Sequence, residues 1–278
     1  MLASVRDRAV EAQVRYLSPM LERPSFHPGD SSRTNLALED RDISIRDMRP
    51  VQDMLSLDRE GFVLVHHSSA VSDFRDADQI RDVYRHEVAE LITSLTGATK
   101  VVVAERALSR LGERSADFGA RGTTYALRMI HTDYTPNSGP GFVSSMLTPE
   151  EMRYWRGRRA AGFSVWRAVS EPPHDMPLAV CDATSIEDAD LMPADVTITR
   201  PDGDDITWEG GFLRHNPLHR WGYFSNMRRD EALVFKMCDS DARRAEQVFH
   251  TAFDDPSAPA DAAPRESVDI RAVALFDD

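Results

Sequence analysis

Short apolar segments recur along this chain, and the turn-forming residues between them leave little room for long helices. Each segment has the length of a β-strand and is rich in β-branched or aromatic residues. The strand-like segments are residues 61–65, 101–103, 163–167, 178–182, 196–199, 206–208, 231–236 and 268–275. Many short strands with few helices are typical of sandwiches and barrels and not of alternating βαβ units. We therefore predict a mainly β fold with flanking helices and a double-stranded β-helix (jelly roll) core.

Two stretches predict helices on the flanks of this core. Residues 76–95 carry apolar side chains at helical spacing, and Gly97 supplies a stop. Thr148, Pro149 and Glu151 predict a second helix start, with an N-cap, a proline in the first turn and a capping-box glutamate. We expect that helix to continue to about residue 161, and the polar residues 239–247 to form a shorter third helix.

The composition of the chain changes near residue 55. Residues 1–55 contain several prolines and a polar run but no motif. We expect them to form an N-terminal extension packed on the core, with an edge strand at residues 43–45. Residues 56–278 then form the double-stranded β-helix domain, a length that β barrels and sandwiches often reach as one unit.

The charge of the chain limits its partners. Its formal net charge is −13 and its pI is about 5.1, whereas binding to nucleic-acid phosphates needs a basic surface. It has no apolar run of transmembrane length and no apolar signal segment at its start. Cys181 and Cys238 fit no disulfide framework or zinc motif, and their apolar surroundings are typical of buried free thiols. We predict a cytoplasmic protein whose partner is a small molecule, and neither nucleic acid nor a membrane.

His131 and Asp133 form the motif that carries the most chemical information. Side chains two residues apart on a strand point to the same side, so this imidazole and this carboxylate can converge on one point. A second imidazole would complete the two histidines and one carboxylate that bind Fe(II) on one face and leave the opposite positions open. His250, His219 and His215 are the candidates, and an ordinary hydrogen-bonded histidine is the alternative for each. We favour His250 because a strand that begins with an arginine follows it.

Arg265 follows His250 at a position suited to hold the far carboxylate of a 2-oxoacid bound to the iron. Its guanidinium can bind a carboxylate through two parallel hydrogen bonds, and the Ser267 hydroxyl on the same strand face can share that carboxylate. Arg271 lies roughly 20 Å from Arg265 along an extended strand. A small 2-oxoacid cannot reach both, so we expect Arg271 to form a salt bridge at the rim of the barrel.

Further residues are candidates for the walls of a substrate cavity. Residues 134–141 are rich in glycine, proline and small polar residues, and predict a flexible substrate lid that begins with Tyr134. Arg167 lies within an apolar strand and needs a partner if it is buried. His219 and Trp221 complete the predicted substrate contacts, with an ordinary core position as the alternative.

Seven separated motifs between residues 131 and 272 match a known enzyme family, and the resemblance covers about residues 40–278. They are His-Thr-Asp-Tyr-Thr at 131–135, Val-Trp-Arg at 165–167, and the segments 177–185, 219–221, 230–240, 250–256 and 264–272. In these motifs the chain resembles the iron and 2-oxoglutarate-dependent oxygenases. That family includes the CmcJ-type cephalosporin 7α-hydroxylase component, gibberellin-desaturase-like proteins and fungal endoperoxide-forming enzymes.

The resemblance implies that residues 56–278 are a double-stranded β-helix oxygenase domain that uses Fe(II), 2-oxoglutarate and O2. It implies that His131, Asp133 and His250 are the iron ligands and that Arg265, helped by Ser267, anchors 2-oxoglutarate. Related halogenases lack the carboxylate ligand, so Asp133 argues against halogenation. Members of the family act on unrelated natural products in secondary metabolism, including antibiotic biosynthesis. The substrate, a partner enzyme and a homo-oligomer therefore stay open.

Three hypotheses follow for the function. The first is an Fe(II)/2-oxoglutarate-dependent oxygenase that hydroxylates, desaturates or cyclises a small natural product. The second is a cupin-like metal-dependent dioxygenase or isomerase that does not use 2-oxoglutarate. The third is a jelly-roll binding protein without catalytic activity, in which the three predicted ligands meet by coincidence.

Overall fold

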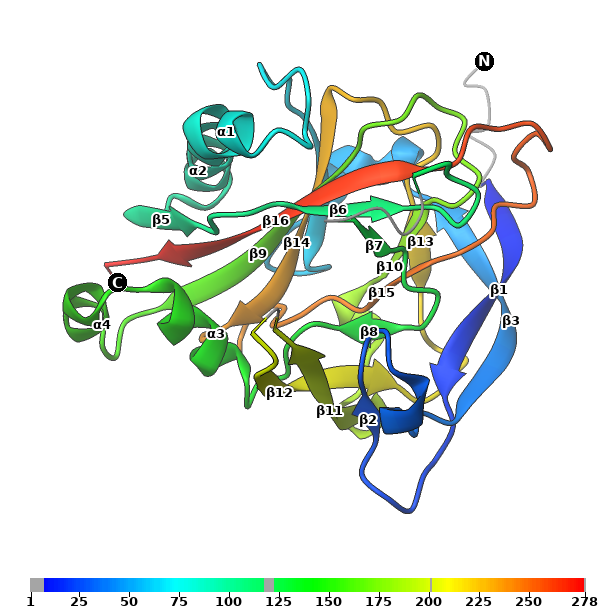
Figure 1. Ribbon diagram of the computed structural model, residues 1–278, viewed down its shortest axis with the longest axis horizontal. Helices are drawn as coiled ribbons and strands as arrows, with labels where there is room; N and C mark the ends of the chain where they lie inside the picture. The colour runs from blue at the N-terminus through cyan, green and yellow to red at the C-terminus, as the bar shows by residue number, and fades with distance from the viewer. Residues whose placement is uncertain (1–7, 118–122, 201, 278) are drawn as a thin grey trace.

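The computed structural model describes residues 8–117, 123–200 and 202–277, and consists mainly of two β-sheets (Figure 1). The strands are β1 (Ala9–Leu17), β2 (Ser25–Phe26), β3 (Leu38–Asp47), β4 (Phe62–His66), β5 (Lys100–Val103), β6 (Leu108–Leu111), β7 (Thr123–Tyr125), β8 (His131–Thr132), β9 (Ala160–Ala168), β10 (Leu178–Cys181), β11 (Leu191–Thr199), β12 (Asp205–Leu213), β13 (Trp221–Tyr223), β14 (Glu231–Asp239), β15 (His250–Ala252) and β16 (Glu266–Leu275). The helices are α1 (Ala77–Gln79), α2 (Arg85–Thr96), α3 (Gly139–Met146) and α4 (Pro149–Tyr154).

The two sheets pack against each other through apolar side chains. Nine strands form one sheet in the order β1-β3-β13-β10-β15-β8-β12-β11-β2, and the other sheet runs β4-β14-β9-β16-β6-β7, with β5 also paired to β16. Trp166 and Phe235 of the second sheet belong to the same buried cluster as Leu178 and Val180 of the first. This face-to-face packing of two curved sheets is the predicted jelly roll.

The predicted N-terminal extension supplies strands to the nine-stranded sheet. β1 pairs with β3 along its whole length, and β3 continues the sheet by pairing with β13. The strand expected at residues 43–45 is therefore part of β3 and lies one position inside the edge, which β1 occupies. The domain boundary near residue 55 stays a prediction.

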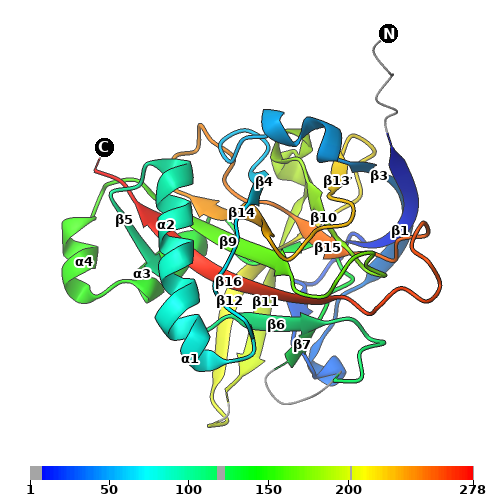
Figure 2. The same cartoon turned by 90° about the horizontal axis from the view of Figure 1, so that it is seen from above.

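The longest predicted helix is present and covers one sheet. α1 and α2 are joined by a π-helical turn at Ile80–Tyr84, the Asp76 side chain caps the start, and Gly97 ends α2 in the left-handed conformation at φ 70°. Figure 2 shows α2 lying across the outer face of the seven-stranded sheet. Its apolar stripe, with Val88 and Ile92, is buried against that sheet. This sheet therefore has one face under the helix and its other face toward the nine-stranded sheet.

Three local predictions need correction. α4 begins with the predicted capping box of Thr148 and Glu151, but it ends at Tyr154, because the chain must extend again to join β9 at Ala160. Residues 239–247 are not helical; the buried Asp239 carboxylate instead pairs with Arg159 and Lys236 at the end of β14.

The third correction concerns the flexible lid expected at residues 134–141. Its second half is the start of α3, with Pro140 in the first turn, where a missing N–H costs nothing. Its first half is a turn in which Ser138 Oγ donates to the Glu209 carbonyl at 2.6 Å and Thr135 Oγ1 donates to the Glu209 carboxylate at 2.5 Å. These bonds attach the segment to β12, and its role as a substrate lid stays a prediction.

Two further predictions concern the cysteines and the membrane. Cys181 and Cys238 are both free and buried, as expected. Within the part of the chain that the structure describes, no helix combines the length and the hydrophobicity needed to cross a membrane. Pro201 lies outside the described residues, and the strands β11 and β12 that flank it pair in antiparallel register.

Candidate metal centre and adjoining cavities

His131, Asp133 and His250 meet near the middle of the nine-stranded sheet. β8 and β15 are neighbours, and His131 and His250 are direct partners across the ladder, so their ring centroids are only 4.4 Å apart. Asp133 follows two residues after His131. One potential ligand atom from each of the three side chains lies within 4.8 Å of the other two. This is the two-histidine, one-carboxylate set that the sequence motif predicted.

The hydrogen bonds of the two imidazoles leave the same nitrogen of each ring free. Nδ1 of His131 is 2.9 Å from the Met129 carbonyl, and Nδ1 of His250 is 3.2 Å from the Val248 carbonyl. A carbonyl oxygen can only accept, so each Nδ1 donates its proton. The Nε2 lone pair of each ring is then available to a cation, the arrangement found in most histidine metal sites.

The charge states of the three groups also suit a metal cation. Burial, followed by the proximity of His250, lowers the pKa of His131 to about 3, and burial lowers the pKa of His250. Burial alone would raise the pKa of Asp133, but the Arg271 guanidinium and the two imidazoles lower it below its ordinary value. At neutral pH the site therefore offers two neutral imidazoles and an ionised carboxylate, the protonation states that metal binding requires.

Arg271 fixes the orientation of the Asp133 carboxylate. Its Nη2 donates to Asp133 Oδ2 at 2.9 Å, and its Nη1 donates to the Tyr134 hydroxyl at 3.1 Å. Tyr134 is held in turn by stacking on Phe142 at a centroid distance of 4.5 Å. The main-chain carbonyl of Asp133 accepts from Trp208 Nε1 at 2.8 Å. The salt bridge expected for Arg271 thus exists, and its partner is the carboxylate of the predicted metal site.

Arg265 lies in the same cavity as the three candidate ligands, in the space between the two sheets. Its side chain is buried, with Nη1 donating to the Met176 carbonyl at 2.7 Å and the guanidinium 5.5 Å from the Trp166 ring centre. Burial lowers its pKa to about 10, so it stays charged at neutral pH. Among the described residues its Nε has no hydrogen-bond partner. A buried cation with an unused donor needs an anion, and a carboxylate matches its geometry.

Ser267 and Arg110 complete the description of this end of the cavity. The Ser267 hydroxyl donates to the Arg110 main-chain carbonyl at 3.3 Å, and Ser267 does not line the cavity that holds Arg265. Arg110 does line it, and its Nε is 3.2 Å from Asp269 Oδ2. Arg110 could not be predicted as a site residue, because it lies on a short strand in which no motif or spacing marks it.

A second cavity, of about 530 Å³, adjoins the candidate ligands. It shares His131, Asp133, Arg110 and Leu127 with the first cavity and is otherwise lined mainly by apolar side chains. These come from the N-terminal segment 26–29, from β6, and from the β11–β12 hairpin. The candidate metal centre therefore lies between a small cavity that ends at Arg265 and a larger apolar cavity.

Three of the predicted substrate contacts lie elsewhere. Trp166 faces the first cavity, so the next residue of β9, Arg167, faces the opposite side, where Nη1 donates to the main-chain carbonyls of His67 and Arg229. His219 is bonded to Asp190 and Tyr16, and Trp221 Nε1 donates to the Tyr16 hydroxyl at 2.8 Å. None of the three lines either cavity at the metal centre, and neither does the fourth predicted contact, Tyr134, whose hydroxyl accepts from Arg271.

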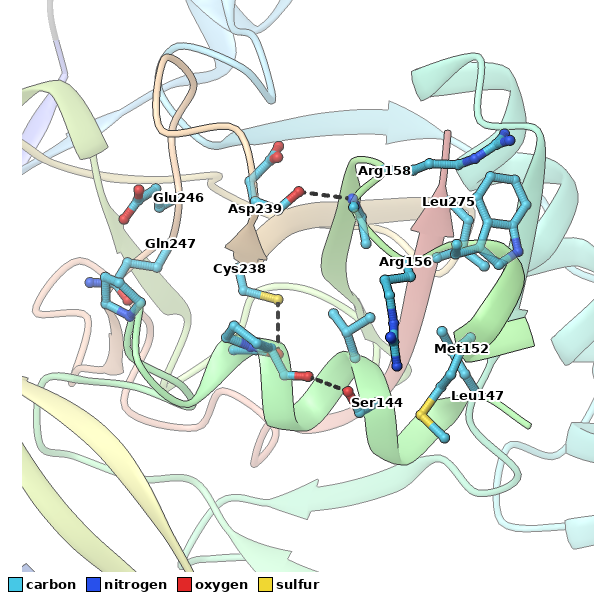
Figure 3. Close-up of a pocket in the computed structure, with 18 residues that line it drawn as sticks. Ser144, Leu147, Met152, Arg156, Arg158, Cys238, Asp239, Glu246, Gln247 and Leu275 are labelled. Atoms are coloured by element: carbon cyan, nitrogen blue, oxygen red, sulfur yellow. Dashed lines mark hydrogen bonds between the residues drawn. The ribbon is translucent and has the colours of Figure 1, made fainter. Parts of the chain in front are cut away.

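A separate hollow of about 590 Å³ lies between α3, α4 and the ends of β14 and β16. Figure 3 shows Ser144 of α3 and Leu147, which follows α3, on one side of it and Cys238 and Asp239 of β14 on another. None of the predicted site residues lines this hollow, so it is no part of the candidate centre.

The comparison with protein families and with known proteins extends over nearly the whole chain. The family model described as "Oxidoreductase/YMDC permease-like domain" matches residues 14–275. The chain is 32% identical over 235 residues, 82% of this chain and 81% of the relative, to the Fe(II)/2-oxoglutarate-dependent dioxygenase nvfI of Aspergillus novofumigatus. It is 28% identical over 297 residues, 100% of this chain and 99% of the relative, to the hydroxylase/desaturase efuI of Hormonema carpetanum.

A solved structure supports the same relationship. The iron and alpha-ketoglutarate-dependent endoperoxidase NvfI superposes with a TM-score of 0.80 at 27% identity, covering 96% of this chain and 98% of that one. The similarity in three dimensions therefore spans both sheets and the candidate centre between them.

Proposed function

This chain belongs to the family of Fe(II)/2-oxoglutarate-dependent dioxygenases, and we propose that His131, Asp133 and His250 hold its iron. It is a non-haem iron enzyme that uses Fe(II) and 2-oxoglutarate and acts on a small molecule, so these sequence-based predictions are confirmed. The cupin-like enzyme and the non-catalytic binding protein do not agree with this membership. The observation that carries the assignment of ligands is the set of two free Nε2 atoms and one ionised carboxylate within 4.8 Å.

Four residues would bind the metal and 2-oxoglutarate, and a fifth would orient one of the metal ligands. His131 and His250 offer Nε2 to the metal, and Asp133 offers a carboxylate oxygen while Arg271 retains its hold on Oδ2. Arg265 binds the far carboxylate of 2-oxoglutarate and supplies the charge that keeps this dianion in a buried cavity. When bound, Fe(II) and 2-oxoglutarate supply the activation of O2 for oxidation of a C–H bond. Ser267 as a helper of Arg265 stays a prediction, because its hydroxyl is bonded to a main-chain carbonyl.

The walls of the smaller cavity protect this chemistry from water. Trp166, Leu178 and Phe235 line it with apolar surface. A low-polarity wall strengthens the attraction between Arg265 and a bound carboxylate and excludes water from the metal. We assign the larger cavity to the substrate, with the C–H bond to be oxidised placed near His131 and Asp133. The relatives are named as a hydroxylase/desaturase and an endoperoxidase. They support a natural-product substrate of secondary metabolism, whereas a cytoplasmic location stays a prediction from the sequence.

Metal stoichiometry in matched variants tests the assignment of the ligands. Anaerobic titration of the metal-free protein with Fe(II) should reach one equivalent in the wild type and fail to saturate in Asp133→Ala and in His250→Ala. His66→Ala removes an imidazole that is 66% exposed and lies outside the cavity, so it should bind iron like the wild type. Full iron binding by His250→Ala would refute the assignment of His250 as a ligand.

A further inference from the structure

The larger cavity has the chemical character of a site for an uncharged, mainly hydrocarbon molecule. We propose that it binds a neutral, predominantly apolar substrate of drug size, selected by the apolar wall that Phe26 and Ile198 contribute. This inference rests on the proposed function, because it assumes that the metal lies at one end of the cavity. A volume of about 530 Å³ falls within the range of cavities that enclose drug-sized ligands.

The walls away from the metal are mainly apolar. They are formed by Phe26 and Pro28 of the N-terminal segment, Leu108 of β6, Met129, Val196 and Ile198 of β11, and Phe212 of β12. β11 turns its apolar side chains toward the cavity. Val196 and Ile198 face the cavity, whereas Thr197 on the other face of the strand bonds to Thr207 at 2.8 Å. Ile198 is 39% exposed. A contiguous apolar surface of this kind, with one side still open to solvent, is typical of a binding site.

The charged groups of the cavity are all at its metal end, and each has a partner. Arg271 is paired with Asp133 at 2.9 Å, and Arg110 with Asp269 at 3.2 Å. An anionic substrate would have to compete with these carboxylates, and a cationic one would meet two guanidinium groups and the metal. Burying a charge without a counter-charge is costly. The cavity therefore favours a neutral molecule.

Contacts within the protein hold the N-terminal wall in place. Phe26 pairs with Val196 in the β2–β11 ladder, and its ring contacts Phe212 edge-on at a centroid distance of 6.4 Å. His27 Nε2 lies 3.1 Å from Thr199 Oγ1. A wall held by such contacts costs little ordering on binding and discriminates by shape. Phe26 is the bulkiest side chain of the segment, so it limits the size of the ligand.

A pair of probes that differ in one charge tests the proposal. Methyl lithocholate and lithocholate share one steroid body, and only the second carries a carboxylate. We would titrate each into the anaerobic complex of the enzyme with Fe(II) and 2-oxoglutarate, following quenching of tryptophan fluorescence, because Trp208 lines the cavity. The neutral ester should bind at least tenfold more tightly than the anion. Equal binding, or tighter binding of the anion, would overturn the proposal.

Two variants and a control assign the binding to this wall. Ile198→Asp introduces a carboxylate at the partly exposed rim and should weaken ester binding at least tenfold, and Phe26→Ala should weaken it severalfold. Leu218→Asp introduces the same charge at a leucine that is 65% exposed and does not line the cavity, and should bind the ester like the wild type. Equal effects of Ile198→Asp and Leu218→Asp would overturn the proposal.

The absorption band of the 2-oxoglutarate–iron chelate separates the two possible failures. A wild-type protein that forms the band but does not prefer the ester refutes the substrate class alone. A wild-type protein that forms no band refutes the proposed site, and the inference about its substrate falls with it.

Discussion

Replacement of Arg265 should destroy the binding of 2-oxoglutarate and spare the binding of iron. The side chain is 2% exposed, and its Nε has no partner among the described residues. Removing one member of a buried, hydrogen-bonded charge pair costs about 2–5 kcal/mol. Arg265→Ala should therefore raise the Kd of 2-oxoglutarate roughly 30- to 5,000-fold. Arg265→Lys keeps the charge but loses the two-pronged geometry, so its Kd should lie between those of the wild type and the alanine variant.

Two titrations carried out without oxygen measure this prediction. Fe(II) is added first, and its Kd should be unchanged because Arg265 is not bonded to His131, Asp133 or His250. 2-Oxoglutarate is then added and followed by calorimetry and by the visible band of the iron chelate. Ser267→Ala is the neighbouring control, and its Kd for 2-oxoglutarate should change less than about threefold because the hydroxyl is bonded to a main-chain carbonyl.

One result would refute the reasoning about Arg265. If Arg265→Ala bound 2-oxoglutarate within about threefold of the wild type, a difference of less than about 1 kcal/mol, the anchor would have to be another cation. Arg110, which lines the same cavity, would then be the residue to replace.

Three further predictions concern the metal ligands and their surroundings. Arg271→Ala should weaken Fe(II) binding about 10- to 100-fold, the usual effect of losing a partner that orients a metal ligand. Arg271→Lys should restore part of that affinity. An unchanged Fe(II) affinity of Arg271→Ala, measured by calorimetry, would show that Arg271 does not orient Asp133 for metal binding. Asp133→Ala should abolish the conversion of 2-oxoglutarate to succinate, measured by chromatography, and turnover that survived would assign the carboxylate ligand elsewhere. The free energy of unfolding of the metal-free protein should fall as the pH drops from about 6.5 toward 3. His131 and His250 have lowered pKa values in the folded protein, so over this pH range they bind protons only after unfolding. Urea unfolding across this pH range should show that the free energy of unfolding declines less steeply in His131→Gln than in the wild type. Parallel curves for the two proteins would contradict the lowered pKa of His131.

The sequence could predict the candidate centre because strand geometry is local. Alternation along a strand places His131 and Asp133 on one side from their spacing alone. The choice of His250 required knowing which late strand lies beside β8, and it followed from the order of motifs along the chain. The direct pairing of His131 with His250 is a long-range property that no local pattern encodes.

Other features depend on contacts between distant residues, and local patterns misjudged them. Glycine and proline at residues 134–141 are typical of a loop, but the second half of the segment begins α3, and bonds to Glu209 attach it to β12. Arg167 was predicted to contact the substrate, but its neighbour Trp166 faces the cavity. Because side chains alternate along a strand, Arg167 must then face the other way. Phe26 belongs to no motif, and it lines the larger cavity only because β2 pairs with β11.

A crystal structure of the enzyme with Fe(II) and 2-oxoglutarate, grown without oxygen and measured at the iron absorption edge, tests the central claim most directly. The account predicts one anomalous peak within coordination distance of His131 Nε2, His250 Nε2 and an Asp133 oxygen, with the far carboxylate of 2-oxoglutarate on the Arg265 guanidinium. A peak at any other set of residues, or 2-oxoglutarate with its far carboxylate away from Arg265, would contradict it.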